Sequence, residues 1–207
     1  MASKLGQYNA ALLILGERKL ASLTENREPR RALDDAYDDA CDYCLEQGFW
    51  NFAMRAIQAD SSASVTPVFG YKYAFAKPSD FIRTYQLGAT ATFEPPLMDI
   101  VDEPNFWYAN VDPLYAKYVS DHPSYGMDLS LWSASFADYH ATRLALKTCK
   151  RITGALPDDK LVAAEKKALA IARSTDAMDE PARFPPRNTW SLSRRGNFAD
   201  RNLNSSR

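Results

Sequence analysis

The feature that most constrains the fold is a change of hydrophobic period in the middle of the chain. Apolar residues recur at helical spacing before residue 49 and again from about residue 130 to 178. Between them, residues 50–119 hold short alternating runs broken by proline. In one run the rings of Tyr71, Tyr73 and Phe75 alternate with other residues, which is typical of an antiparallel sheet with one solvated face. The sequence therefore predicts helices in both outer parts of the body and strands between them.

These segments predict one overall architecture. Helices are expected from Ser3 to Gly16, from Pro29 to Gly48, from Asp128 or Ser130 to about Thr153, and from Pro157 to about Met178. Strands are expected over residues 54–57, 65–76, 81–87 and 97–101. We expect a mainly α fold with α+β character. An antiparallel bundle of about four helices (residues 1–49 and 120–180) would carry a small antiparallel β insertion (50–119) and an extended C-terminal arm (181–207).

Composition narrows the class of protein. A chain of 207 residues that is 46 % hydrophobic suits one domain with an insertion or a tail. It lacks the run of about 18 apolar residues that a membrane span needs, and residues 1–6 lack the features of a secretory signal. Three cysteines are too few for a disulfide framework. A protein of a cytoplasm-like compartment with reduced thiols is expected.

The C-terminal arm differs in charge from the rest of the chain. It holds six arginines, one aspartate and no lysine, a net charge of +5, which leaves −6 for residues 1–180. Its aromatic residues make it too apolar for a simple solvating linker, so we expect it to order on a partner. Arginine beside Trp and Phe is typical of protein interfaces, but it also suits phosphates and bases. The expected docking residues are Phe184, Arg187, Trp190, Arg194, Arg195 and Phe198.

The residues with catalytic or metal-binding potential have simpler explanations. Cys41 and Cys44 have the spacing of a metal or redox pair, but they lie within a predicted helix and no second pair accompanies them. His122 lies in a predicted turn and His140 within a helix, and neither has a nucleophile that the sequence reveals. No phosphate-binding glycine motif is present. We therefore expect no catalytic residue, no metal and no cofactor, and a protein that is not an enzyme.

An acidic stripe runs along the second predicted helix. Its members, four residues apart, are Asp34, Asp38, Asp42 and Glu46. Such a stripe is most often a solvated face. Cation coordination and a surface that repels DNA remain the alternatives.

Five segments follow one another along the chain: Ala11–Glu17, Leu20–Glu25, Phe49–Ala53, Tyr73–Arg83 and the closing stretch Pro185–Gly196. Taken in this order, they resemble the tail tubular protein A family, the head-to-tail adaptors of short-tailed bacteriophages. Each segment is weakly specific by itself. The ordered set covers most of the chain and is more specific than its parts.

The resemblance implies a structural virion protein rather than an enzyme. Twelve copies would form a ring under the portal protein and continue the channel through which genomic DNA passes without sequence readout. The ring would also offer a surface to the tail nozzle, a tail tubular protein B-like partner, and to tail fibres. It would assemble in the host cytoplasm and reside at the head–tail junction of the virion. The expected subunit or nozzle interface comprises Tyr71, Tyr73, Phe75, Asp80 and Arg83. The alternative is a nucleic-acid-binding module that uses the arginine-rich, aromatic arm.

Overall fold

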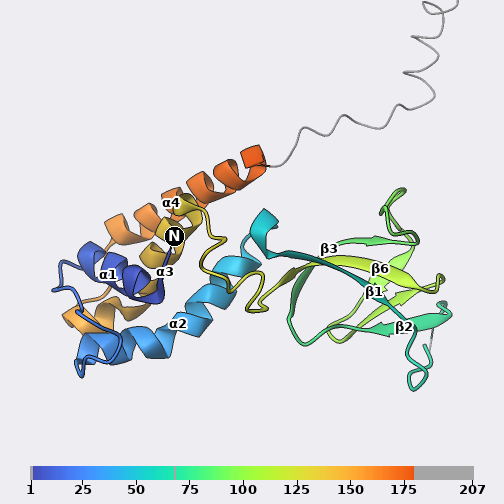
Figure 1. Cartoon of the computed structure of the whole chain (residues 1–207), viewed down its shortest axis with the longest axis horizontal. Coiled ribbons are helices and arrows are strands. Elements are labelled where there is room, and N and C mark those ends of the chain that lie inside the picture. Colours follow the sequence, from blue (N-terminus) through green and yellow to red (C-terminus); the bar gives the residue numbers. More distant parts are fainter. Residues whose placement is uncertain (1, 68, 180–207) are drawn as a thin grey trace, which may run out of the picture.

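The computed structural model describes residues 2–67 and 69–179 of the chain. Its helices gather at one end of the long axis and its strands at the other (Figure 1). We call these parts the helical half and the strand half. The helices are α1 (Lys4–Ile14), α2 (Glu28–Glu46), α3 (Ala134–Thr153) and α4 (Asp159–Asp179). In these described ranges, no helix is both long enough and apolar enough to cross a membrane.

Local signals explain where the helices begin and end. Ser3 caps α1 by accepting a hydrogen bond from the Gly6 amide, and Ser133 caps α3 in the same way through the Phe136 amide. Pro29 lies in the first turn of α2, where its missing N–H has no cost. Gly154 ends α3 with a φ of 74°, a conformation that glycine adopts without strain.

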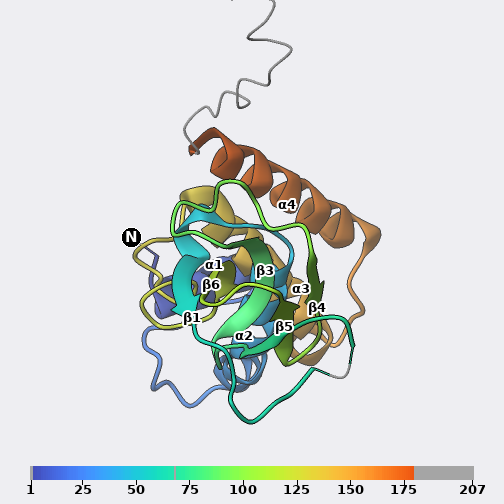
Figure 2. The same cartoon turned by 90° about the vertical axis from the view of Figure 1, so that its right-hand side faces the viewer.

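Helix α3 is the centre of the helical half. It packs against α1, α2 and α4, while α2 and α4 lie on opposite sides of it (Figures 1 and 2). The apolar stripe predicted for the second helix is confirmed, because its members are buried in α2 together with Cys41. The largest fully buried side chains of this core are Tyr8, Leu12, Leu33, Leu45, Trp50, Phe136, Tyr139 and Leu144.

The strand half consists of two three-stranded antiparallel sheets. The first has the order β1 (Met54–Ala59), β6 (Leu114–Ser120), β3 (Phe81–Gly88), and the short 3-10 helix Asn51–Ala53 leads into β1. The second has the order β2 (Tyr73–Ala76), β5 (Phe106–Ala109), β4 (Ile100–Asp102). The fully or almost fully buried side chains of their shared core include Phe75, Leu87, Trp107, Leu114 and Tyr118.

The expectation of a mainly α fold with a small β insertion is wrong. The described residues are 42 % helical and 19 % strand, and the strands build two sheets with a hydrophobic core of their own, which makes the fold α+β. The prediction missed β5 and β6. Strand β5 has four residues, three of them buried in succession, so it does not show the period of two that marks a half-buried strand. Strand β6 alternates between buried and partly buried residues over 114–118 before its last three residues are all buried, and the prediction overlooked this alternation.

Candidate functional site: a cationic and aromatic groove

A surface groove of about 600 Å³ lies where the helical half meets the strand half. Its walls come from five places: the turn 47–51 after α2, Met54 of β1, Arg83 and Tyr85 of β3, Lys117 of β6, and residues 173, 176 and 177 of α4. We call it the junction groove. It joins residues that are far apart in the sequence.

The turn after α2 places the neighbouring rings of Phe49 and Trp50 on opposite sides of the backbone. Trp50 is buried in the helical core, where its Nε1 donates to the Cys44 carbonyl at 2.9 Å and its ring lies 4.8 Å from that of Phe136. Gly48 permits this insertion, since a Cβ at that position would lie 2.8 Å from the Trp50 ring. Phe49 consequently points outward into the groove and remains 39 % exposed.

Cations and rings alternate on one wall of the groove. The Arg83 guanidinium lies 4.4 Å from the centre of the Phe49 ring, and the Tyr85 ring meets Phe49 edge-on at 5.2 Å. The Lys117 ammonium lies 5.1 Å from the centre of the Tyr85 ring. Each such exposed cation–π contact contributes about 0.5–1 kcal/mol, so the wall has a preferred arrangement before anything binds.

The C-terminal end of α2 holds two of the cations in place. Arg83 Nη1 donates to the Glu46 carbonyl at 3.3 Å, and Arg173 Nε donates to the Gln47 carbonyl at 3.0 Å. The last carbonyls of a helix lack intrahelical donors and carry partial negative charge, so they attract cations. The helix end therefore orients both guanidinium groups at the groove.

Helix α4 is tied to the same turn by a pair of hydrogen bonds. The Asn51 amide donates to Asp176 Oδ1 at 3.0 Å, and Asn51 Nδ2 donates to the Asp176 carbonyl at 2.8 Å. Asp176 is the one carboxylate among the described lining residues, against three cations. Within residues 2–67 and 69–179, Arg83, Lys117 and Arg173 form no ion pair. The groove thus offers positive charge to a carboxylate or a phosphate.

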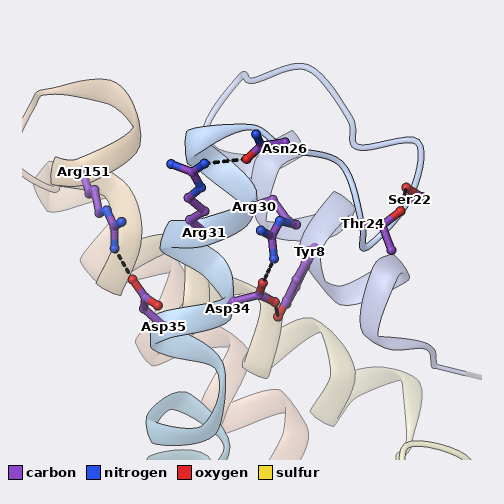
Figure 3. A network of polar contacts seen from close by, with 9 residues as sticks. All are labelled: Tyr8, Ser22, Thr24, Asn26, Arg30, Arg31, Asp34, Asp35 and Arg151. Carbon is purple, nitrogen blue, oxygen red and sulfur yellow. Dashed lines mark hydrogen bonds and ion pairs between the residues drawn. The ribbon is translucent and has the colours of Figure 1, made fainter.

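The acidic stripe of α2 divides into paired and unpaired members. Asp34 of the stripe binds Arg30 and accepts from the Tyr8 hydroxyl at 2.6 Å, while Asp35, which lies beside the stripe, binds Arg151 at 2.5 Å (Figure 3). Asp39, beside the stripe, binds Lys147 at 2.6 Å. These contacts tie α2 to α1 and α3.

The remaining three carboxylates of the stripe, Asp38, Asp42 and Glu46, we call the acidic row. All three are exposed, and no ion pair reaches them from the described part of the chain. Partial burial raises the pKa of the Asp42 carboxyl, and the nearby carboxylates of Asp121 and Asp38 raise it further. The row is a concentration of negative charge without a compensating cation.

The predicted interface residues lie in different surroundings. Phe75 is fully buried in the strand core, so it has no surface to offer. Tyr71 and Tyr73 are partly exposed, and the Tyr71 hydroxyl donates to Asp99 at 3.0 Å. Arg83 is exposed and lines the junction groove. The structure therefore does not gather these residues into one patch.

Asp80, the fifth predicted interface residue, is an internal anchor. Its carboxylate accepts hydrogen bonds from Tyr118 at 3.1 Å and from Ser120, and it forms an ion pair with Arg55 at 2.8 Å. Burial acts to raise its pKa, but the hydrogen bonds from Ser120, Arg55 and Tyr118 outweigh burial and hold the pKa below its usual value. Asp80 thus joins the beginning of β3 to β6 and β1.

The cysteine and histidine candidates belong to the helical core. Cys41 and Cys44 are free and buried, which confirms that they pack in the core. Cys41 Sγ lies 3.3 Å from His140 Nε2, and His140 Nδ1 lies 3.0 Å from Gln7 Oε1. Burial lowers the pKa of His140 to about 4 and raises that of Cys41 to about 12, so both are neutral at pH 7. No group of three or more potential metal ligands occurs in the described residues.

The docking residues predicted in the arm, Phe184, Arg187, Trp190, Arg194, Arg195 and Phe198, lie outside the described residues. Two stretches singled out in the sequence, Phe49–Ala53 and Tyr73–Arg83, contribute to the junction groove. Lys117 and Arg173 were missed, because each looks like an ordinary surface residue of its own element.

The junction groove combines three properties of a recognition surface: exposed rings, unpaired cations and side chains held in position by backbone contacts. These properties suit docking of an acidic surface or a phosphate backbone. No protein-family model matches the chain, and no curated protein matches it.

Proposed function

We propose that this chain is a subunit of the head-to-tail adaptor of a short-tailed bacteriophage. Twelve copies would form a ring in the host cytoplasm, join the portal protein to the tail nozzle, contact tail fibres, and remain at the head–tail junction of the virion. Genomic DNA would pass through the lumen without sequence readout. The role is structural and includes no catalytic step, metal or cofactor.

The observation that carries the proposal is the division of the body into two halves. The helical half and the strand half have separate hydrophobic cores and lie at opposite ends of the long axis (Figure 1). A connector must present chemically different surfaces to two different partners. Two independently packed ends allow each surface to be shaped without disturbing the other core. The ordered resemblance to phage adaptors supports the same assignment.

The arm supplies a second element of the proposal. It follows α4, which ends at Asp179, and it carries the arginine and aromatic residues that interfaces favour. An extended segment increases the area buried against a neighbour without enlarging the core of its own subunit. We assign it to the portal or to an adjacent subunit, and the exposed part of the Tyr71–Arg83 region to the nozzle or a neighbour.

Portal binding tests the proposal directly. The full-length protein is mixed with its cognate portal assembly, and the mass of the complex is measured by light scattering after size-exclusion chromatography. We expect a portal-bound ring. Truncation after Asp179 should leave the melting temperature unchanged, because both described cores lie within residues 2–179, but it should abolish portal binding.

Two double variants with the same change in net charge distinguish specific docking of the arm from nonspecific electrostatic attraction. Arg194→Ala/Arg195→Ala should weaken portal binding at least tenfold, while the control Arg201→Ala/Arg207→Ala, which removes the same charge, should have a smaller effect. Full portal binding by the truncated protein would reject the proposed docking role of the arm. Failure of the intact chain to bind portal would reject the proposal that the chain is an adaptor.

One observation favours a second candidate, a module that binds single-stranded nucleic acid. The junction groove combines three cations with the rings of Phe49 and Tyr85, the set that grips a phosphate backbone and stacks bases. Such binding would weaken steeply with salt. A fluorescent oligonucleotide titrated at 50 and 200 mM salt measures it, and strong salt-dependent binding by a chain that ignores portal would put this candidate first.

A further inference from the structure

The acidic row is a linear array on the outer face of α2. Its members follow at four-residue intervals, so the row extends about 12 Å along the helix. The buried side chains of α2 occupy the opposite face, which leaves the row exposed. Asp34, Asp35 and Asp39 have cation partners, whereas the row has none among the described residues. The fold therefore satisfies the neighbouring acids and leaves these three in solvent.

The junction groove, in contrast, holds positive charge without carboxylate partners. Its three cations, Arg83, Lys117 and Arg173, have no carboxylate partner within the described ranges. Contacts with backbone carbonyls and aromatic rings hold them in position. Three fixed cations and three carboxylates at regular spacing are matched in number and opposite in sign.

The row ends where the groove begins. Its last member, Glu46, directly precedes the lining residue Gln47, and the Glu46 carbonyl accepts a hydrogen bond from Arg83 of the groove. Asp42 and Asp38 lie about 6 Å and about 12 Å further back along the helix, so a rigid α2 cannot seat all three carboxylates in the groove of its own molecule. A row and a groove at different places on one surface can pair between copies in a head-to-tail manner.

We infer that the acidic row of one copy docks in the junction groove of a second copy. In this arrangement the carboxylates of Asp38, Asp42 and Glu46 face Arg83, Lys117 and Arg173, and the exposed ring of Phe49 becomes covered. Single exposed ion pairs contribute little, so the contact depends on the three pairs acting together and on burial of the ring. The inference rests on the self-association that the proposed function includes.

Reciprocal charge reversal tests the pairing. At low salt the wild-type chain should show a mass above 23.2 kDa that rises with protein concentration and falls as salt is added. The row variant Asp38→Lys/Asp42→Lys and the groove variant Arg83→Glu/Lys117→Glu should each remain monomeric. Their mixture should associate again, because the reversed row of one fits the reversed groove of the other.

Two controls exclude effects of net charge and of unfolding on the association. Asp60→Lys/Glu94→Lys makes the same change in net charge at exposed acids of the strand half, and it should associate like the wild type. Thermal melting checks the groove variant, because Arg83 also donates to the Glu46 carbonyl. The substituted residues of the row variant form no ion pair within the described ranges, and thermal melting checks this variant as well.

A cross-link identifies the contact itself. A carbodiimide joins a carboxylate to the Lys117 amine as an amide only when the two groups touch. In a mixture of ¹⁴N- and ¹⁵N-labelled protein, we expect links between Lys117 and Asp38, Asp42 or Glu46 that combine the two labels. Association without these links, or association that survives in both charge variants, would overturn the inference.

Failure of this inference is distinguishable from failure of the adaptor proposal. A wild-type chain that stays at 23.2 kDa without mixed-label links overturns the inference, and the adaptor stands if that monomer still binds portal. The reverse result is a chain that pairs head-to-tail but does not bind portal. It would support the inference and reject the adaptor proposal.

Discussion

Single residues show how context assigns different roles to similar side chains. Phe49 and Trp50 are neighbours, yet one is 39 % exposed in the junction groove and the other is almost fully buried in the helical core. Asp42 and Asp80 are both aspartates, but burial and nearby carboxylates raise the pKa of Asp42, while three hydrogen-bond donors hold that of Asp80 down. Residue type alone predicts none of these differences.

The lowered pKa of Asp80 gives stability that depends on pH. A carboxyl group whose folded pKa lies below its unfolded value of about 3.9 stabilises the fold above that pH and loses the contribution as the pH falls through the folded pKa. We therefore expect the free energy of unfolding of the wild type to fall more steeply than that of Asp80→Asn below about pH 4.

Urea unfolding at pH 7, 5, 4 and 3 measures this dependence. The control Asp60→Asn alters an exposed carboxylate and should parallel the wild type. Asp121, whose pKa burial and Asp80 raise, acts in the opposite direction, so the test compares the slopes of the two curves. Equal slopes for wild type and Asp80→Asn would show that Asp80 is not an ionised anchor.

At the scale of elements, α3 organises the helical half because it contacts the other three helices. Its beginning depends on one side chain. Ser133 Oγ accepts a hydrogen bond from the Phe136 amide at 3.2 Å, which satisfies a donor that the first turn leaves free.

Ser133→Ala should therefore cost about 1 kcal/mol of the free energy of unfolding. Ser174→Ala, at an exposed position within α4, is the matched control and should be neutral or slightly stabilising, because alanine favours the helix. Urea denaturation monitored by circular dichroism gives both values. An equal effect of the two substitutions would mean that the cap contributes nothing.

At the scale of the whole molecule, the two cores meet along β6. Tyr118 belongs to the strand core and the next residue, Val119, to the helical core. The cores otherwise consist of different residues, so substitutions deep in each have no shared neighbours.

The free-energy changes of Leu12→Ala and Leu114→Ala should consequently add. Each removes a fully buried leucine and should cost about 2–5 kcal/mol, and the double variant should equal the sum within about 0.5 kcal/mol. Equilibrium urea unfolding of the three variants provides the test. A larger coupling would show that the two cores pack as one.

The helices and strands β1 to β4 could be predicted from the sequence, whereas β5, β6 and the groove as a whole were not. The stripe from Leu33 to Leu45 repeats at helical spacing over several turns, so local periodicity was sufficient. Strand β5 has only four residues, too few for a period of two to be distinct. For the groove, nothing in the sequence around Lys117 indicates that its side chain lines a groove with residues of other elements.

The sequence by itself determined the helices, the acidic stripe and the charge contrast between body and arm, because spacing and charge are properties of neighbouring residues. Only the tertiary structure decided that Phe49, Tyr85, Lys117 and Arg173 share a groove and that the acidic row ends at the edge of this groove. The physical reason is that these positions come together through the packing of α4 on α3 and the pairing of β3 with β6, which are contacts between distant segments.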